Sequence, residues 1–143
     1  MLKRIPTSKE ARMKIMEVET KAKEDLIDIT ERVAREVASL GFKRGVIVLF
    51  VPHTTAGLTI NENADPAVKK DLLMALRRMV PSDLPFSHSE GNSPAHVKAT
   101  LCGSSLQVIV ENGNLCLGTW QGITFCEFDG PRRRRLYLTF LPK

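Results

Sequence analysis

The sequence predicts an α+β domain in which β-strands pack on β-strands, as in a β-sandwich, and two main helices cover part of them. Two segments, 28–41 and 65–81, have apolar residues at every third or fourth position, which places these side chains on one face of an α-helix. From residue 97 onward, short apolar or alternating segments are separated by turn residues, a pattern typical of strands. Two helices among about seven or eight strands indicate a sheet-dominated domain.

The first predicted strand covers residues 13–20, and the charged residues 21–25 are expected to form a turn. The helix that follows begins with Asp28 and Glu31, whose spacing matches a capping box, and ends at Gly41, which tolerates a left-handed conformation. Its apolar face consists of Ile29, Val33, Val37 and Leu40.

Residues 46–51 are continuously apolar and mostly β-branched, which predicts a strand buried on both faces. Residues 56–60 predict another strand. The second helix is expected to be capped by Asp65, to have Pro66 at its first position and to end before Pro81. Its predicted buried face consists of Val68, Leu72, Leu76 and Met79.

Residues 81–95 contain three prolines and are expected to form a loop. The remaining predicted strands cover residues 97–102, 106–111, 115–117, 122–128 and 136–141. Asn112 and Gly113 form a strong hairpin-turn signal between two of these strands.

The composition is that of one globular domain covering residues 1–143, with 43% apolar and 26% charged residues. Residues 1–14 are polar and basic, so we expect no signal peptide, and no segment approaches the length of a membrane span. The three cysteines, Cys102, Cys116 and Cys126, lack CxxC spacing and indicate reduced core thiols of a cytoplasmic protein. The net charge of +5 mildly favours anionic partners.

Two of the three histidines, His88 and His96, lie in a short segment with Glu90 and Asn92. A glycine and a proline between them disfavour a helix and predict a shaped loop, to which we expect the fold to bring His53. Three imidazoles can bind zinc and leave a fourth position open, although histidines bonded to the backbone or exposed in a loop are equally ordinary. Glu90 is either a proton carrier beside these histidines or a solvated carboxylate.

Gln121 and Glu127 are predicted to share one strand face with Ile123 and Phe125. A carboxylate on such an apolar face is either partnered or functional. Six residues of strand separate the two side chains by about 20 Å, so they cannot serve one pocket within a subunit unless the strand bends. A symmetric oligomer would instead bring Glu127 to a neighbouring site.

The run Arg132–Arg135 enters the last predicted strand, where alternation sends two arginines to each face. One pair is expected to clamp an anionic substrate or to pair with Glu127 across an interface. A nucleic-acid arm is the weaker alternative, because aromatic residues make up only 6% of the chain.

Five motifs in this order resemble those of the YjbQ-like family, small proteins of bacteria, archaea and some eukaryotes. They are Val51–Ala56, Asn61–Pro66, His88–Asn92 with Ala95 and His96, Leu117–Ile123, and Cys126–Arg132. The resemblance covers nearly the whole chain, from about residue 15 to the C-terminus.

The resemblance implies an α+β homotrimer and a secondary thiamine-phosphate synthase activity. It also implies that the polar residues of the motifs line a pocket. By their matching positions, the implied metal ligands are His53, His88 and His96, the implied catalytic residues are Glu90, Gln121 and Glu127, and the implied substrate-binding residues are Thr54, Glu62, Asn92 and Arg132. Zinc suits histidine ligands best, whereas Mg²⁺ would suit the synthase reaction.

We therefore expect a metal-dependent enzyme that acts on a small phosphorylated or anionic substrate. In this expectation the metal acts as a Lewis acid or activates water, Glu90 carries protons and Arg132 clamps the anion. The alternatives are a non-catalytic homotrimer that binds a metal or an anion and, less favoured, nucleic-acid binding through Arg132–Arg135. No membrane partner is expected.

Overall fold

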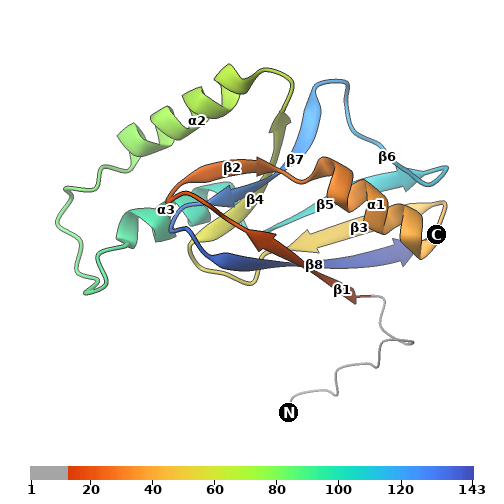
Figure 1. Cartoon of the computed structure of the whole chain (residues 1–143), viewed down its shortest axis with the longest axis horizontal. Coiled ribbons are helices and arrows are strands. Elements are labelled where there is room, and N and C mark those ends of the chain that lie inside the picture. The colour runs from red at the N-terminus through yellow and green to blue at the C-terminus, as the bar shows by residue number, and fades with distance from the viewer. Residues whose placement is uncertain (1–12) are drawn as a thin grey trace, which may run out of the picture.

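Two antiparallel β-sheets lie face to face in the computed structural model, which describes residues 13–143 (Figure 1). The five-stranded sheet has the order β1 (Met13–Glu19), β8 (Arg133–Pro142), β3 (Gly45–Phe50), β5 (Ser105–Glu111) and β6 (Asn114–Leu115). The three-stranded sheet has the order β2 (Asp25–Asp28), β7 (Gln121–Glu127) and β4 (Ala56–Glu62). The helices are α1 (Thr30–Leu40), α2 (Pro66–Met79) and α3 (Ser93–Cys102). The predicted α+β class is confirmed, while most of the polar segment 1–14 lies outside the described residues.

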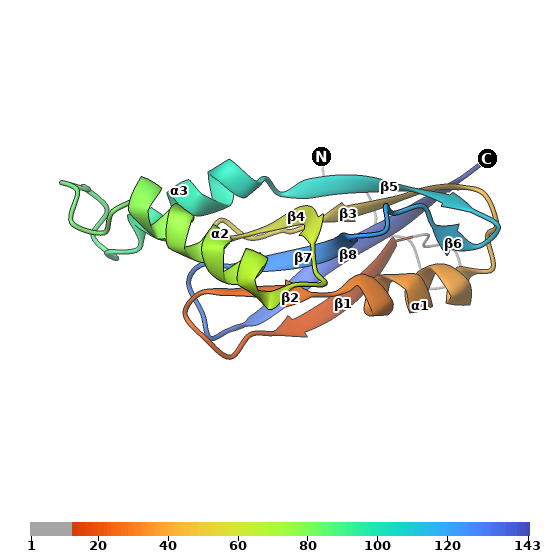
Figure 2. The same cartoon turned by 90° about the horizontal axis from the view of Figure 1, so that it is seen from above.

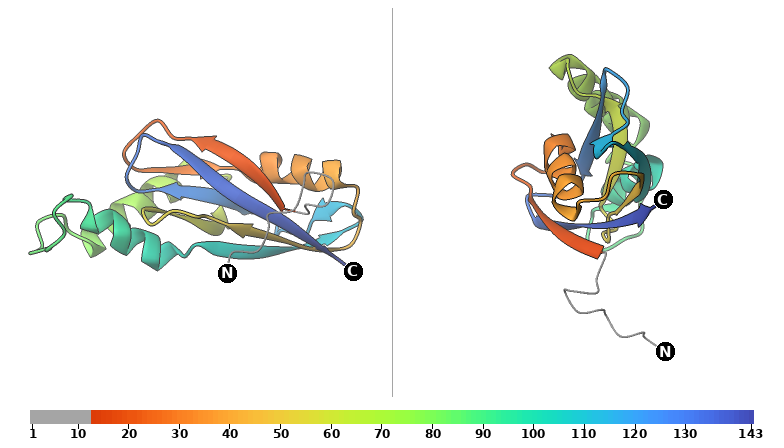
Figure 3. Two further views of the ribbon diagram at one scale, coloured as in Figure 1. Left: turned by 90° about the horizontal axis from the view of Figure 1, so that it is seen from below. Right: turned by 90° about the vertical axis from the view of Figure 1, so that its right-hand side faces the viewer.

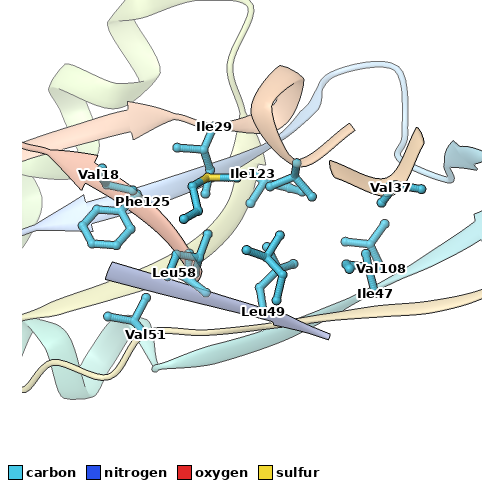
Figure 4. Close-up of a cluster of buried hydrophobic side chains, with 14 of the residues drawn as sticks. Val18, Ile29, Val37, Ile47, Leu49, Val51, Leu58, Val108, Ile123 and Phe125 are labelled. Carbon is cyan, nitrogen blue, oxygen red and sulfur yellow. The ribbon is translucent and has the colours of Figure 1, made fainter. Parts of the chain in front are cut away.

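The main core fills the space between the two sheets and extends under α1 (Figure 4). Leu49 of β3 lies in the middle of this cluster with Leu58 of β4 and Ile123 of β7, whereas Ile47 lies opposite Val37 of α1. All five side chains are at most 2% exposed. Strand residues alternate between the two faces of a sheet, so every second residue of these strands enters the core. The α1 stripe is confirmed at the buried Val33 and Val37.

The other face of the three-stranded sheet is covered by α2 and α3 (Figures 2 and 3). Phe128 and Cys126 pack there against Ala95 and Ala99 of α3. Gly57 of β4 lets the end of α3 approach closely, because a Cβ at this position would lie 2.6 Å from the Gly103 carbonyl oxygen. That carbonyl accepts a hydrogen bond from the Leu58 backbone N–H at 3.0 Å, which fixes α3 against the sheet.

The prediction of a loop over residues 88–96 followed by a strand over 97–102 is wrong from Ser93 onward, where α3 begins. Pro94 lies in the first turn of the helix, where no backbone N–H is needed and a proline is tolerated. The buried residues Ala95, Lys98 and Ala99 have helical spacing. The helical spacing is not apparent in the sequence, because one of these buried positions is a lysine, of which only the aliphatic stem is apolar.

Two further local predictions fail at charged residues. Residues 21–24 form no helix or strand, in keeping with the predicted turn over 21–25, but Asp25–Asp28 forms the short strand β2, which was not predicted, with Leu26 buried against β7. The capping box at α1 is also not formed: Asp28 Oδ1 accepts the Thr30 N–H at 3.0 Å, and no side chain caps the helix at Ile29. In contrast, the Asp65 cap, Pro66 at the start of α2 and the hairpin at Asn112–Gly113 are confirmed.

Several positions predicted to be buried are exposed because they face away from this chain's own core. Phe50 of β3 is 44% exposed, and α2 has no fully buried residue, with Met79 being 66% exposed. Cys126 is buried as predicted, but Cys102 is half-buried and Cys116 is exposed. The outer face of the five-stranded sheet has several exposed apolar side chains, which we call the outer sheet face: Met13, Ile15, Phe50, Ile109 and Leu141.

Candidate functional site

All three histidines meet at one pocket of about 370 Å³, here called the histidine pocket. One wall is the segment that follows β3, the second is the loop before α3 together with α3, and the third is the turn between β7 and β8. The lining residues are Pro52, His53, Thr54, Thr55, His88, Glu90, Asn92, His96, Asp129, Arg132 and Arg134. Segments far apart in the chain therefore place imidazole, carboxylate, amide and guanidinium groups side by side.

The His53 side chain continues the β3–β8 hydrogen bonding just beyond the end of β3. If the register of the two strands continued, Pro52 would lie opposite Arg135, but it is His53 Nε2 that accepts the Arg135 backbone N–H, at 2.9 Å. Burial lowers the pKa of His53, and the nearby charge of Arg134 lowers it further. His53 is therefore neutral at pH 7, and because Nε2 is an acceptor, its hydrogen is on Nδ1.

His88 and His96 lie edge to face, with ring centroids 5.5 Å apart. His96 is in α3, whereas His88 is in the loop before it, and its Nε2 is 3.8 Å from Glu90 Oε2. The His88 and Glu90 side chains are 44% and 71% exposed, so both can contact a ligand and exchange protons with solvent.

Asp129 holds two other lining residues in place. Asn92 Nδ2 donates a hydrogen bond to Asp129 Oδ2 at 3.0 Å, and Arg132 Nη2 donates to the same oxygen at 2.8 Å. Arg132 Nε also donates to the Asp129 carbonyl at 2.7 Å. The guanidinium is fixed at the rim and still half-exposed, while the buried Asn92 Oδ1 has no hydrogen-bond partner among residues 13–143.

Beneath the pocket, a buried ion pair joins β7 to β8. Arg134 donates from Nε to Glu127 Oε1 at 2.9 Å and from Nη2 to Glu127 Oε2 at 2.5 Å. Burial opposes ionisation of Glu127, but the hydrogen bonds from Arg134 and Thr20 outweigh it and lower the pKa of the carboxyl group. Arg134 Nη2 also donates to Thr55 Oγ1 at 2.9 Å, so the pair supports the pocket wall.

The turn after β7 closes tightly over this ion pair. Glu127 Oε2 accepts the backbone N–H groups of Phe128 and Asp129, each at 3.1 Å. A Cβ on Gly130 would lie 2.9 Å from both Glu127 Cγ and Thr20 Oγ1, so no larger residue fits there without a shift. The expected pairing of Glu127 across an interface is wrong, because its arginine partner lies in the same chain.

Three of the four arginines in the run 132–135 form ion pairs within the chain. Arg134 is buried against Glu127, Arg132 pairs with Asp129, and Arg133 pairs with Glu19 at 3.5 Å. The described residues therefore do not present this run as one basic patch.

The described residues 13–143 contain no group of three or more His, Cys, Asp or Glu side chains arranged to hold a metal ion. Within the same range, no helix is long and apolar enough to cross a membrane.

The model of the family described as UPF0047 protein YjbQ-like matches residues 14–143. The chain belongs to this family. It is 48% identical to the UPF0047 protein YugU of Bacillus subtilis, over 90% of this chain and 98% of that protein. It is also 48% identical to a UPF0047 protein of Methanocaldococcus jannaschii, over 87% of this chain and 91% of that one.

Solved YjbQ-like structures share the fold. A crystal structure from Clostridium acetobutylicum superposes with a TM-score of 0.87 at 50% identity, covering 89% of this chain and 98% of that one. A YjbQ-like protein of Sulfolobus solfataricus gives the same TM-score at 31% identity, covering 92% and 96%. The names of these relatives specify no reaction, so the function is argued from the geometry.

The residues of the YjbQ-like motifs divide between the two ends of β7. The histidine pocket contains His53, Thr54, His88, Glu90, Asn92, His96 and Arg132. Gln121 starts β7 and pairs with Glu62 of β4, whereas Glu127 ends β7. Gln121 Oε1 accepts the Gly118 N–H at 2.8 Å, so within this chain Gln121 and Glu62 do not join the histidine pocket.

Sequence reasoning missed the pocket roles of Asp129 and Thr55. It did expect an arginine of the 132–135 run to pair with Glu127, but across an interface, whereas Arg134 of the next strand pairs with Glu127 within the chain. No sequence pattern indicated that Asp129 orients both Asn92 and Arg132.

We predict that the His53 imidazole titrates below pH 6.5 and is protonated on Nδ1 at neutral pH, because burial and Arg134 disfavour the imidazolium. Two-dimensional ¹H–¹⁵N NMR of the imidazole rings over a pH series measures both properties. A His53→Gln variant assigns the signal, since glutamine can still accept the Arg135 N–H. A titration above pH 6.5, or an Nε2–H tautomer, would contradict this geometry.

Proposed function

We propose that the histidine pocket binds a small phosphorylated or otherwise anionic substrate and that the protein is an enzyme acting on it. The observation that carries this proposal is the convergence of the Arg132 guanidinium and the His53 Nδ1–H donor with His88 and His96 in one open pocket. Donors of this kind bind phosphate oxygens, and imidazole side chains are common proton-transfer groups.

Each lining group has a distinct role in this proposal. Arg132 clamps the anion, because its fixed guanidinium still has N–H groups directed to solvent. Glu90 carries protons to and from His88, which lies 3.8 Å away. Thr54 and Asn92 orient the substrate through their polar side chains.

Glu127 acts from beneath the pocket in this proposal and does not touch the substrate. Its side chain is fully buried, and both carboxylate oxygens accept hydrogen bonds within the chain. It holds Arg134, and through it Thr55, in the geometry that the pocket requires.

The spacing of two of the three implied ligands supports a zinc ion in this proposal. Two imidazoles on one tetrahedral zinc ion have ring centroids about 5 Å apart, which is close to the 5.5 Å between His88 and His96. His53 does not fit in its present orientation, because its Nε2 is occupied by Arg135 N–H and its Nδ1 is protonated. We therefore propose His88 and His96 as ligands, with Glu90 as the nearest carboxylate; bound zinc would supply a Lewis acid.

Secondary thiamine-phosphate synthase activity is the most specific form of this proposal. The reaction joins a pyrimidine diphosphate to a thiazole phosphate and releases diphosphate, so both substrates and the leaving group are anions. Mg²⁺ would favour oxygen ligands, which Glu90 and Asp129 offer at the same pocket.

We also propose that the protein is a cytoplasmic homotrimer. The outer sheet face supports an oligomer, since apolar side chains from β1, β3, β5 and β8 gather there. In such an assembly, Gln121 and Glu62 would reach a histidine pocket only from a neighbouring copy. The free thiols of Cys102, Cys116 and Cys126 fit a reducing compartment.

A non-catalytic homotrimer that binds a metal or an anion is the second candidate function. It is favoured because His53 is hydrogen-bonded to the Arg135 backbone and Glu127 is paired with Arg134, so these three side chains already have structural partners within the chain. Phosphate-ester turnover by the metal-loaded protein distinguishes the two candidates. Nucleic-acid binding finds less support, because Arg134 is buried and Arg132 and Arg133 are paired.

We predict that inorganic phosphate binds the protein and that Arg132→Met weakens this binding at least about tenfold, the effect of losing one charge-assisted hydrogen bond. Isothermal titration calorimetry at neutral pH measures the affinity. Arg133→Met is the matched control. It removes the same charge at the next residue, whose side chain does not line the pocket. Equal losses in both variants would indicate attraction by net charge alone and would contradict a built anion site.

We predict about one zinc ion per chain after equilibration with micromolar Zn²⁺, and its loss in His88→Ala and His96→Ala. Elemental mass spectrometry of dialysed protein gives the stoichiometry. His53→Gln is expected to retain the metal, because His53 is not a ligand in this proposal. Loss of zinc in His53→Gln as well would restore the three-histidine site, and no zinc in the wild type would exclude the metal proposal.

A further inference from the structure

A second cavity, of about 410 Å³, lies between α2, α3 and the segment that leads into β2. We call it the helix cavity. It shares Glu90, Asn92 and Asp129 with the histidine pocket, so the two spaces are separated by these side chains. Its size falls within the range of small-molecule sites, and α2 packs loosely beside it, having no fully buried residue.

Lys98 supplies a buried cation to the helix cavity. The residue is 6% exposed, and its Nζ donates to Glu24 Oε2 at 2.7 Å. Glu24 also accepts from Arg77 Nε at 2.9 Å; burial opposes ionisation of Glu24, but the bonds from Lys98 and Arg77 outweigh it and lower its pKa. An ammonium group can donate three hydrogen bonds. Among the described residues, Lys98 Nζ has one acceptor, Glu24 Oε2.

Asn92 supplies an acceptor that also lacks a partner. Its Nδ2 is bonded to Asp129, whereas none of the described residues donates a hydrogen bond to its buried Oδ1. Leaving a buried acceptor unpaired is energetically costly, so such an atom marks a place where a donor belongs.

The walls of the helix cavity complete the chemistry. Lys23 and Arg77 add positive charge to that of Lys98, whereas Val80 and Phe128 contribute apolar surface. The wall also has three carboxylates: Glu24 is bonded to Lys98 and Arg77, Asp129 is bonded to Arg132, and Glu90 is 71% exposed at the border with the histidine pocket, 3.8 Å from His88. A ligand with an anionic group, a short carbon chain and a hydroxyl donor matches these groups.

We propose that the helix cavity is a second binding site, which takes a small hydroxyl-bearing organic anion such as a sugar- or polyol-phosphate. The anionic group accepts from Lys98, a hydroxyl group donates to Asn92 Oδ1, and the carbon chain lies against Phe128. This site does not depend on the function proposed for the histidine pocket. Because Asn92 and Asp129 border both spaces, the two ligands would lie next to each other.

Glycerol 3-phosphate is a suitable probe, followed by ¹H–¹⁵N NMR of the full-length protein. We expect saturable shifts of the Val80, Gly91 and Lys98 amides. Lys98→Met is expected to weaken binding at least about tenfold, and propyl phosphate, which lacks the hydroxyl groups, is expected to bind less tightly by a similar factor.

A second variant keeps the test valid if Lys98→Met unfolds. Ser82 is exposed at the rim of the cavity, so Ser82→Trp is expected to block the site and abolish these shifts. Ser87→Trp is the matched control, because Ser87 is exposed in the same loop and lines neither space.

Arg132→Met separates this proposal from the function proposed above, since it impairs the histidine pocket but is expected to leave the Val80 and Lys98 shifts intact. The proposal is overturned if no saturable shift occurs at millimolar probe, if the shifts are confined to Thr54 and His96 at the histidine pocket, or if Ser82→Trp leaves them unchanged.

Discussion

The ion pair between Glu127 and Arg134 is the interaction on which the functional end of the molecule depends. It joins the last residue of β7 to the start of β8, on the interior side of the two sheets. Two charges removed from water need complete hydrogen bonding, and here Thr20, Thr55 and two backbone N–H groups provide it. The partners that satisfy the pair also shape the pocket, since Thr55 lines it two residues after His53 and the two N–H groups belong to the turn that bears Asp129.

The two halves of the pocket differ in how firmly they are held. Arg132, Asn92 and His53 are fixed by hydrogen bonds to Asp129 or to the backbone of β8. His88 and Glu90 lie on an exposed loop, where their side chains can move toward a ligand. In the proposed function, Arg132 would clamp the anion from a fixed position while the more exposed Glu90 and His88 would transfer protons, so that different groups perform positioning and proton transfer. The helix cavity shares Glu90, Asn92 and Asp129 with this pocket, so the two proposed ligands would be neighbours.

Much of the fold could be predicted from the sequence, because alternation and helical spacing reflect one buried face. The cores of β3, β4, β5, β7 and β8, the α1 stripe and the cap of α2 follow from local patterns. The predictions fail where charged residues are buried or lie in a strand. The buried Lys98 interrupts the apolar pattern of α3, and the aspartates of β2 interrupt the apolar pattern of that strand. The exposure of Phe50 and Met79 could not be predicted, since apolar patterns do not reveal whether a residue is covered by its own chain. At the site, the motifs predicted the convergence of seven residues, whereas the intrachain partner of Glu127 and the role of Asp129 depend on contacts between distant segments.

A double-mutant cycle on Glu127 and Arg134 tests most directly whether this ion pair organises the histidine pocket. The variants are Glu127→Leu, Arg134→Met and the combination, measured by denaturant unfolding and by phosphate affinity. Each single variant is expected to lose about 3–5 kcal/mol of unfolding free energy, because it leaves one buried charge without its partner. The double variant is expected to lose less than the sum, by at least about 1.5 kcal/mol, and still to bind phosphate weakly, because Thr55 and the 128–129 turn are no longer held. Additive losses together with wild-type phosphate affinity in the double variant would contradict this account.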